Sequence, residues 1–194
     1  MRKHTISRDT AETKINVTYD VDGTGEGEIK TGVGVLDHML VLFKGHGLFD
    51  LDVFCDGDIE VDYHHTTEDI GIALGQAFKV AMGDKAGITR YATVSIPMDE
   101  ALATVHLDIS GRSHLVYRVE GLKDKVGQFD TELVQEFFQG FANHAGVTLH
   151  IQVEYGTNTH HMIEAIFKAF ARALDKASSL NPRIKGIPST KGVL

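Results

Sequence analysis

The sequence predicts an α+β fold built from two similar halves, each with a small, mostly antiparallel sheet and two helices on one face. A motif, His-His-x-x-Glu, occurs at residues 64–68 and again at 160–164. Each copy opens a segment whose apolar residues recur every three or four positions, as on one face of a helix. Segments of alternating apolar and polar residues, typical of half-buried strands, precede each copy. We therefore expect one unit of two repeats, at about 5–92 and 93–181, followed by a basic C-terminal tail.

The order of elements in the first half follows from these two periodicities. The expected elements are strands at 12–21 and 28–31, a helix at 36–46, strands at 51–55 and 59–61, and the helix that opens at His64. The glycines within 23–27 are typical of a flexible hairpin, and Asp56-Gly57 is typical of a second hairpin turn. The last helix is expected to end near Gly83 or Gly87.

The second half repeats this pattern with small differences. The expected elements are strands at 90–98, 101–110 and 114–119, a helix at 133–144, a strand at 147–153, and a helix from His160 to about Leu180. The interval from His38 to His46 equals the interval from Glu136 to His144. His38 and Glu136 therefore occupy equivalent positions on the first helix of each half.

The repeated motif has the geometry of a metal-binding helix. His64 and Glu68 are four residues apart, so they lie one above the other and can bind one ion together. His65 lies about 100° further round the helix, where it can reach a second ion. One adjacent histidine pair is more often a surface feature, but two copies with the same glutamate favour two metal sites. Imidazole with carboxylate suits zinc, manganese or iron better than calcium.

The repeat also indicates which residues share an ion. One predicted site contains His64, Glu68, His161 and Glu136, and the other contains His160, Glu164, His65 and His38. Each set leaves room for a substrate or a water molecule. This crossed pattern requires helices of the two halves to meet, either within one chain or between chains.

Composition excludes several classes of protein. An apolar content of 42% and a charged content of 24% over 194 residues are ordinary for a soluble globular protein. The net charge of −8 argues against nucleic acid or an anionic membrane as the main partner. No apolar run is long enough to span a bilayer, and the N-terminus does not resemble a signal peptide. The single cysteine, Cys55, excludes an intramolecular disulfide, and we expect a cytoplasmic location.

Six motifs together resemble the imidazoleglycerol-phosphate dehydratase family, lyases of histidine biosynthesis. They are RDTAET at 8–13, GVLDHML at 34–40, HHTTEDIG at 64–71, DISGR at 108–112, HHMIEAIFKAF at 160–170 and PSTKG at 188–192. The resemblance covers nearly the whole chain. It implies dehydration of a phosphorylated imidazole substrate, two Mn²⁺ per active site, and a homo-oligomer of 24 subunits with active sites between subunits.

The resemblance also implies roles for individual residues. The catalytic residues would be Glu12, His38, His64, His65, Glu68, His160, His161 and Glu164, with Glu12 moving the proton. The substrate would be bound by Glu12, His46, Arg90, Arg112, Lys168, Ser189, Thr190 and Lys191, whose charges and hydroxyls suit a phosphate. The metal ligands would be His38, His64, His65, Glu68, Glu136, His160, His161 and Glu164. Many members carry histidine where this chain has Glu136, and glutamate is also a manganese ligand.

Two other functions use the same residues. A dinuclear metal hydrolase would cleave a phosphate ester or amide with a bridging hydroxide as the nucleophile. A metal-binding or nucleic-acid-binding scaffold would need no enzyme chemistry. The acidic charge argues against nucleic acid, and a metal store would not need the Arg, Lys and Ser set. The products formed from imidazoleglycerol phosphate, a ketone or inorganic phosphate, would distinguish the dehydratase from the hydrolase.

Overall fold

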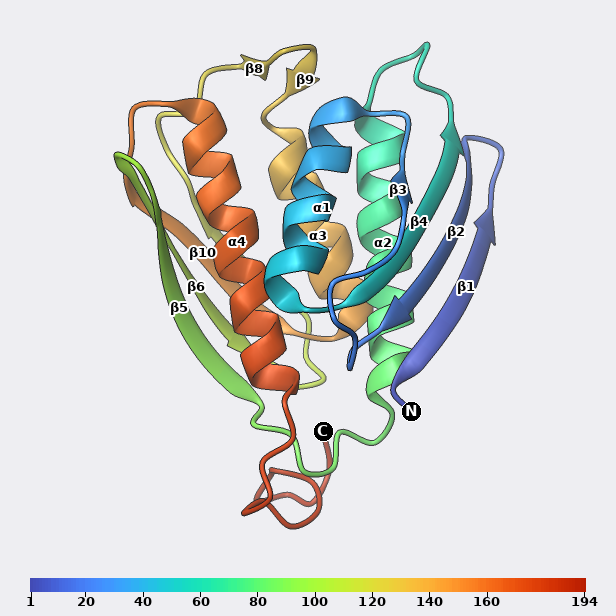
Figure 1. The fold of residues 1–194 in the computed structure, drawn as a ribbon, viewed down its shortest axis with the longest axis vertical. Coiled ribbons are helices and arrows are strands. Elements are labelled where there is room, and N and C mark those ends of the chain that lie inside the picture. The colour runs from blue at the N-terminus through green and yellow to red at the C-terminus, as the bar shows by residue number, and fades with distance from the viewer.

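Two four-stranded sheets enclose four helices in the computed structural model, which describes residues 1–194 (Figure 1). The first half contains β1 (Lys3–Asp9), β2 (Thr13–Asp20), β3 (Ile29–Lys30), α1 (Gly34–Gly47), β4 (Asp50–Gly57) and α2 (His64–Met82). The second half contains β5 (Tyr91–Met98), β6 (Ala101–Asp108), β7 (His114–Arg118), β8 (Lys125–Val126), β9 (Phe129–Asp130), α3 (Leu133–Ala145), β10 (Thr148–Tyr155) and α4 (Thr159–Ser178). None of the helices has the length and apolar character required to cross a membrane.

The two sheets have the same topology. Their strand orders are β1-β2-β4-β3 and β5-β6-β10-β7. In each sheet the first three strands are antiparallel, and the fourth joins the edge in parallel. This confirms the predicted α+β fold with a duplicated half-domain. A small hairpin of β8 and β9 lies outside both sheets.

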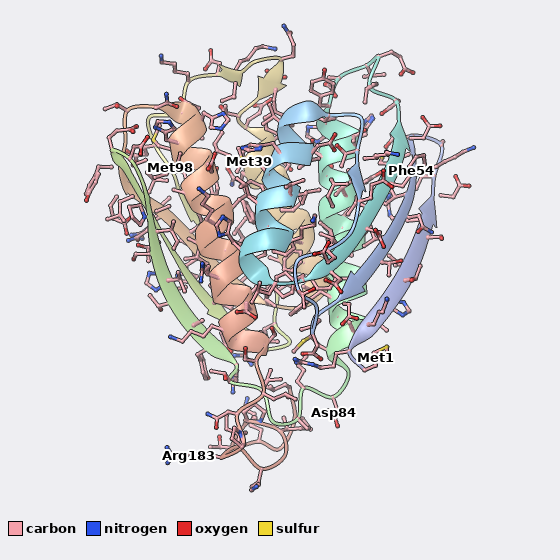
Figure 2. All side chains as sticks on the ribbon, viewed as in Figure 1. Met1, Met39, Phe54, Asp84, Met98 and Arg183 are labelled. Atoms are coloured by element: carbon pink, nitrogen blue, oxygen red, sulfur yellow. The ribbon has the colours of Figure 1, made fainter.

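Alternation along the strands determines which face of each sheet is buried. On β2 the side chains of Ile15, Val17 and Tyr19 are buried, and they pair with the buried Cys55, Val53 and Leu51 of β4. Since successive side chains point to opposite faces, one face of the sheet is apolar and packs on the helices. Met39 of α1 lies in the resulting core, whereas Phe54 on the other face of β4 is 55% exposed (Figure 2).

The helices of the two halves pair crosswise in the middle of the molecule. Helix α2 packs on the first sheet and α4 on the second, while α1 contacts α4 and α3 contacts α2. Aromatic side chains join the halves: Phe43 stacks on Phe170 with ring centroids 5.3 Å apart, and Phe78 lies 5.8 Å from Phe141. Each half therefore keeps its sheet on one side and its helices on the other, and the helices meet in the middle.

Helices α2 and α3 approach so closely that only glycine fits between them. A methyl group on Gly71 would overlap the carbonyl oxygen of Phe137, and one on Gly140 would lie 3.0 Å from the carbonyl oxygen of Glu68. Any larger residue would push the helices apart. Because Glu136 lies one turn before Gly140, this contact brings its side chain toward the first turns of α2.

Both predicted hairpins of the first half are wrong. Residues 29–30 do form a strand, but β3 pairs in parallel with β4 rather than folding back on β2. The preceding loop runs along β4, where the Asp50 carboxylate accepts hydrogen bonds from the backbone N–H groups of Thr24 and Glu26. Because β2 and β3 occupy both edges of β4, residues 59–61 have no strand to pair with and form a turn. The sequence patterns also did not predict β1 or the β8–β9 hairpin.

Candidate functional site

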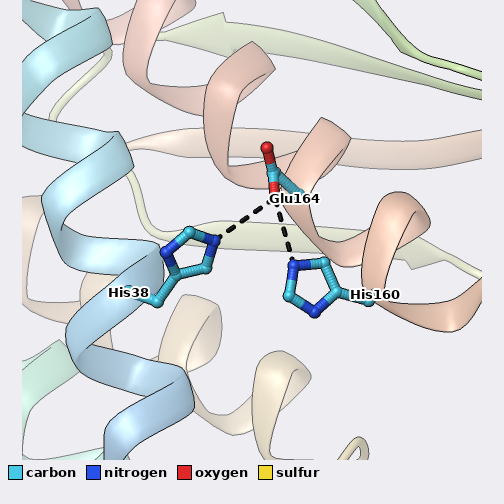
Figure 3. A group of neighbouring side chains, drawn as sticks. All are labelled: His38, His160 and Glu164. Carbon is cyan, nitrogen blue, oxygen red and sulfur yellow. Dashed lines mark hydrogen bonds and ion pairs between the residues drawn. The ribbon is translucent and has the colours of Figure 1, made fainter.

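The crosswise contact of α1 with α4 brings together His38, His160 and Glu164 (Figure 3). The Nε2 atoms of His38 and His160 lie 3.3 and 3.2 Å from the same Glu164 oxygen, Oε2. The three ligand atoms lie within 4.8 Å of one another. Both imidazoles are more than 40% exposed, while the Glu164 side chain is only 10% exposed. Two imidazole nitrogens and one carboxylate oxygen thus converge at a site open to solvent.

Glu164 is held in its charged form. Burial raises the pKa of its carboxyl, but hydrogen bonds from Lys168 and His38 outweigh that effect and bring the pKa down to about 2. The Lys168 Nζ atom donates to Oε1 at 2.5 Å, on the oxygen that does not face the histidines. At neutral pH the carboxylate is therefore ionised, as a metal ligand must be.

The contact of α2 with α3 forms an equivalent cluster of His64, Glu68 and Glu136. The His64 Nε2 atom lies 3.3 Å from the Glu68 Oε2 atom, and both side chains are 41% exposed. Glu136 completes the group from α3, at the position equivalent to His38 on α1. The second cluster thus contains one imidazole and two carboxylates, whereas the first contains two imidazoles and one carboxylate.

His65 and His161 do not join either cluster within one chain. The Nδ1 atom of His65 lies 2.7 Å from Asp58, and its Nε2 atom lies 3.6 Å from Glu12. The Nδ1 atom of His161 lies 2.8 Å from Glu100. These contacts follow from helical geometry, since each residue is rotated about 100° from the preceding histidine. The fold of one chain therefore does not form the crossed ligand sets.

The carboxylates of Asp58 and Glu100 change the pKa of the histidines that they contact. The hydrogen bond to Asp58 raises the pKa of His65, and the hydrogen bond to Glu100 raises the pKa of His161. In return, the hydrogen bond from His161 and those from backbone N–H groups lower the pKa of Glu100 to about 2.

Glu12 lies in a short loop that a buried carboxylate holds over the start of α2. Asp69 accepts a hydrogen bond from the Thr13 hydroxyl at 2.6 Å and pairs with the Arg8 guanidinium at 2.8 Å. The two contacts hold the loop before and after Glu12, whose own side chain is 51% exposed. The loop is thus attached to the helix that carries His64, His65 and Glu68.

Most of the predicted phosphate-binding residues lie together in another place. Arg90, Arg112, Ser189, Thr190 and Lys191 line one pocket of about 620 Å³. Arg90 donates to Asp108 at 2.8 Å and to the Pro188 carbonyl oxygen at 2.8 Å, which holds the C-terminal segment against the start of β5. Its backbone φ of 76° lies in the left-handed region, which is uncommon for a residue other than glycine. The arrangement provides cations and hydroxyl groups suited to a phosphate.

The segment after α4, which helps to line the pocket, lies at one end of the molecule, opposite to the start of α4 (Figure 1). The backbone N–H of Arg90 donates to the carbonyl oxygen of Ala177 near the end of α4, whereas His160 lies at its start. At 1.5 Å per residue, those two positions are about 25 Å apart. One chain therefore does not place its pocket of predicted phosphate-binding residues beside its own histidine clusters.

His46 and Lys168 lie between the two ends. Burial is the main cause that lowers the pKa of His46, and the nearby Lys168 and Arg172 add to it. The imidazole is thus kept neutral beside two cations. Lys168 is itself committed to Glu164, as described above.

Four acidic residues of the site had no role predicted from the sequence. Asp58 lies in the segment that we interpreted as a hairpin, Asp69 follows Glu68 directly, and Asp99 lies 3.9 Å from the Nε2 atom of His161. Glu100 also had no predicted role. The only signal for Asp58 is an acidic side chain shortly before the histidine pair, which is too common a pattern to identify a contact.

The fold and the paired clusters define a class of duplicated α+β proteins with one histidine–carboxylate group at each crossing of helices. The profile of the imidazoleglycerol-phosphate dehydratase family matches residues 31–174. A protein of that name from Oceanobacillus iheyensis is 60% identical over 194 residues, covering 100% of both chains. Another from Pelobacter propionicus is 59% identical, covering 100% of this chain and 99% of the relative. The chain belongs to the imidazoleglycerol-phosphate dehydratase family and is accordingly a hydro-lyase.

Solved structures agree with this membership. The imidazoleglycerol-phosphate dehydratase from Staphylococcus aureus superposes with a TM-score of 0.85 at 45% identity, covering 92% of this chain and 99% of that one. The structure of IGPD from Pyrococcus furiosus gives a TM-score of 0.84 at 38% identity, covering 97% and 100%. The similarity therefore extends to the three-dimensional arrangement of both halves.

Proposed function

We propose that this protein removes water from D-erythro-imidazoleglycerol phosphate to form imidazole acetol phosphate, a step of L-histidine biosynthesis, with the aid of metal ions. The observation that carries the proposal is the pair of three-ligand clusters on equivalent helix crossings. They occur in a chain that aligns over its full length with relatives named for this reaction.

The residues present fit two Mn²⁺ ions per active site. Nitrogen and carboxylate oxygen donors converge within 4.8 Å in both clusters, and no thiolate, which would favour softer ions, takes part. His38, His160 and Glu164 would hold one ion, and His64, Glu68 and Glu136 the other. Bound there, the ions would act as Lewis acids that stabilise negative charge developing on the imidazole ring of the substrate.

Glu12 is the residue that we propose to move the proton. The reaction must take a weakly acidic proton from the carbon next to the ring, and this requires a positioned base. Glu12 is in neither cluster, its carboxylate is half exposed, and its loop is held on both sides by Asp69. A base that is free of metal, accessible and fixed in place meets this requirement.

The phosphate group would be bound in the pocket of Arg90, Arg112, Ser189, Thr190 and Lys191. Guanidinium and ammonium groups neutralise its charge, and the hydroxyls donate hydrogen bonds. Asp108 keeps the Arg90 guanidinium in place through two hydrogen bonds of 2.8 and 3.3 Å. Binding of the phosphate, which is remote from the reacting carbon, would position that carbon beside the Glu12 carboxylate.

The separation of pocket and clusters supports assembly of the active site from several copies. The substrate has one ring, a three-carbon chain and a phosphate, and it is far shorter than the distance of about 25 Å between the two regions of one chain. A homo-oligomer can bring the two regions together, because one copy can supply the phosphate pocket and another copy the metal ligands. We propose the 24-subunit shell as that assembly, with His65 and His161 completing ligand sets across subunits.

Product analysis tests the proposed function. Purified protein with manganese is incubated with imidazoleglycerol phosphate, and the ketone and inorganic phosphate are measured separately. The dehydratase forms the ketone in proportion to the substrate consumed and releases no phosphate. Release of phosphate without ketone would identify a dinuclear hydrolase instead, and no conversion at all would contradict both functions.

A further inference from the structure

The second histidine of each His-His pair makes the same contact in both halves. Asp58 lies 2.7 Å from the Nδ1 atom of His65, and Glu100 lies 2.8 Å from the Nδ1 atom of His161. A carboxylate oxygen accepts, so the hydrogen of each imidazole is on Nδ1. The Nε2 atom of each neutral ring then carries a free lone pair.

The two carboxylates come from positions that the internal repeat does not relate. Asp58 directly follows β4 and lies in the segment that leads to α2, whereas Glu100 lies in the turn between β5 and β6. The segment before α4, 156–158, contains no acidic residue. Instead, Glu100 contacts this segment from the turn between β5 and β6. Its carboxylate accepts hydrogen bonds from the backbone N–H groups of Thr157 and Asn158 at 3.1 and 2.7 Å. Two unrelated segments thus supply the carboxylate for the same contact. The contact in the second half is therefore not simply a copy of the one in the first half.

Stability alone gives little reason for these contacts. The His65, His161 and Glu100 side chains are 34%, 27% and 34% exposed, and the Asp58 side chain is 19% exposed. Ion pairs at such partly exposed positions contribute little to folding free energy. Such a contact has a clear use in a metal site. A carboxylate that accepts from one imidazole nitrogen orients the ring and raises the basicity of the other nitrogen, which binds the metal.

The nearby acids leave the Nε2 atoms free. Glu12 lies 3.6 Å from Nε2 of His65, and Asp99 lies 3.9 Å from Nε2 of His161, both beyond hydrogen-bond distance. Neither Nε2 atom therefore makes a hydrogen bond within the chain.

We propose that Asp58 and Glu100 are positioning residues that hold His65 and His161 in the tautomer and orientation in which Nε2 binds metal. The inference rests on the proposed two-metal function and adds two residues to it. Asp58 acts through His65 and Glu100 acts through His161, so each carboxylate supports a different one of the two ions.

Manganese titration calorimetry of the complete protein, without substrate, tests this role. Wild-type protein is expected to bind about two ions per chain. Asp58→Ala and Glu100→Ala should each leave one ion bound normally and weaken the other by about 10–100-fold, the usual effect of losing such a carboxylate. Asp58→Asn and Glu100→Gln keep an oxygen that accepts from Nδ1 but lose the charge, so they should show a smaller loss. Where an alanine variant does not fold, its amide counterpart carries the test.

Matched control variants distinguish the orientation of a histidine from the general effect of losing one negative charge. Asp56→Ala and Glu120→Ala each remove an exposed acid that makes no hydrogen bond or ion pair with a side chain, and they should bind as wild type does. Variants of Asp58 and Glu100 that bind both ions within two-fold of wild type would overturn the positioning role while leaving the proposed function intact. Wild-type protein that takes up no manganese would overturn both.

Discussion

The side chains of His38 and Glu164 meet at 3.3 Å although 126 residues separate them in the chain. The contact exists because α1 of the first half packs on α4 of the second. The equivalent packing of α2 on α3 brings Glu136 to His64 and Glu68. Both candidate metal-binding clusters therefore depend on how the helices of the two halves pack together.

Metal content should follow the two clusters separately. His160→Ala removes one of three ligands from a single cluster, so the purified variant should retain about one ion per chain where the wild type holds about two. Elemental analysis after equilibrium dialysis measures this. His150→Ala, which alters an exposed histidine on β10, is the control and should hold the wild-type amount. Wild-type content in His160→Ala would contradict the proposed ligand role.

Removing a guanidinium from the pocket should weaken phosphate binding. Arg112→Ala is expected to cost about 1.5–3 kcal/mol in binding of inorganic phosphate, the range for a hydrogen bond to a charged group. Competitive inhibition by phosphate measures the change. Arg183→Ala alters an exposed arginine of the same C-terminal segment that does not line the pocket. If phosphate inhibits Arg112→Ala as strongly as it inhibits this control, Arg112 does not bind phosphate.

Asp69 should stabilise the loop that carries Glu12. Asp69→Ala leaves the Thr13 hydroxyl and the Arg8 guanidinium without their acceptor, and we expect a loss of about 1–3 kcal/mol in the free energy of unfolding. Urea unfolding of the metal-free protein measures it. The variant should also have a lower kcat, because the base is no longer fixed. Unchanged values for both would show that the loop does not depend on Asp69.

Acid should destabilise the metal-free protein through Glu164. Its pKa is about 2 in the folded state against an ordinary value of 4.5. Because the folded pKa is depressed, the stabilisation is fully present above pH 4.5 and is lost as the pH falls from there through about 2. The difference corresponds to about 3 kcal/mol. Urea unfolding of wild type and Glu164→Gln across this range measures it, and the variant should show a shallower pH dependence. Parallel curves would mean that another group dominates.

Local patterns were enough to predict much of the fold and the residues that gather in the two clusters. Periodicity predicted all four helices, because each has a long apolar face. It did not predict that β3 pairs with β4, since a two-residue strand has no pattern and its partner is chosen by tertiary packing. Residues 59–61 alternate like a strand, yet both edges of β4 are already occupied. The edge strand β1 was missed because none of its residues is fully buried and Ile6 is its only apolar residue.

Contacts between distant segments explain what sequence could not predict about the site. The spacing of His64 and Glu68 follows from one helix, but the link from His161 to Glu100 spans 61 residues and depends on the turn between β5 and β6. The distance between the phosphate pocket and the histidines also has no local signature. It follows from the length of α4, which holds His160 at one end and the backbone of Arg90 near the other.

Diffraction at the manganese absorption edge from crystals of the manganese-loaded assembly would locate the bound ions directly. We expect two anomalous peaks per chain, one bound by His38, His160 and Glu164 and one bound by His64, Glu68 and Glu136. Each ion should also be bound by an Nε2 atom of His65 or His161 from a neighbouring copy. A single peak per chain, or peaks away from these clusters, would contradict the two proposed metal sites.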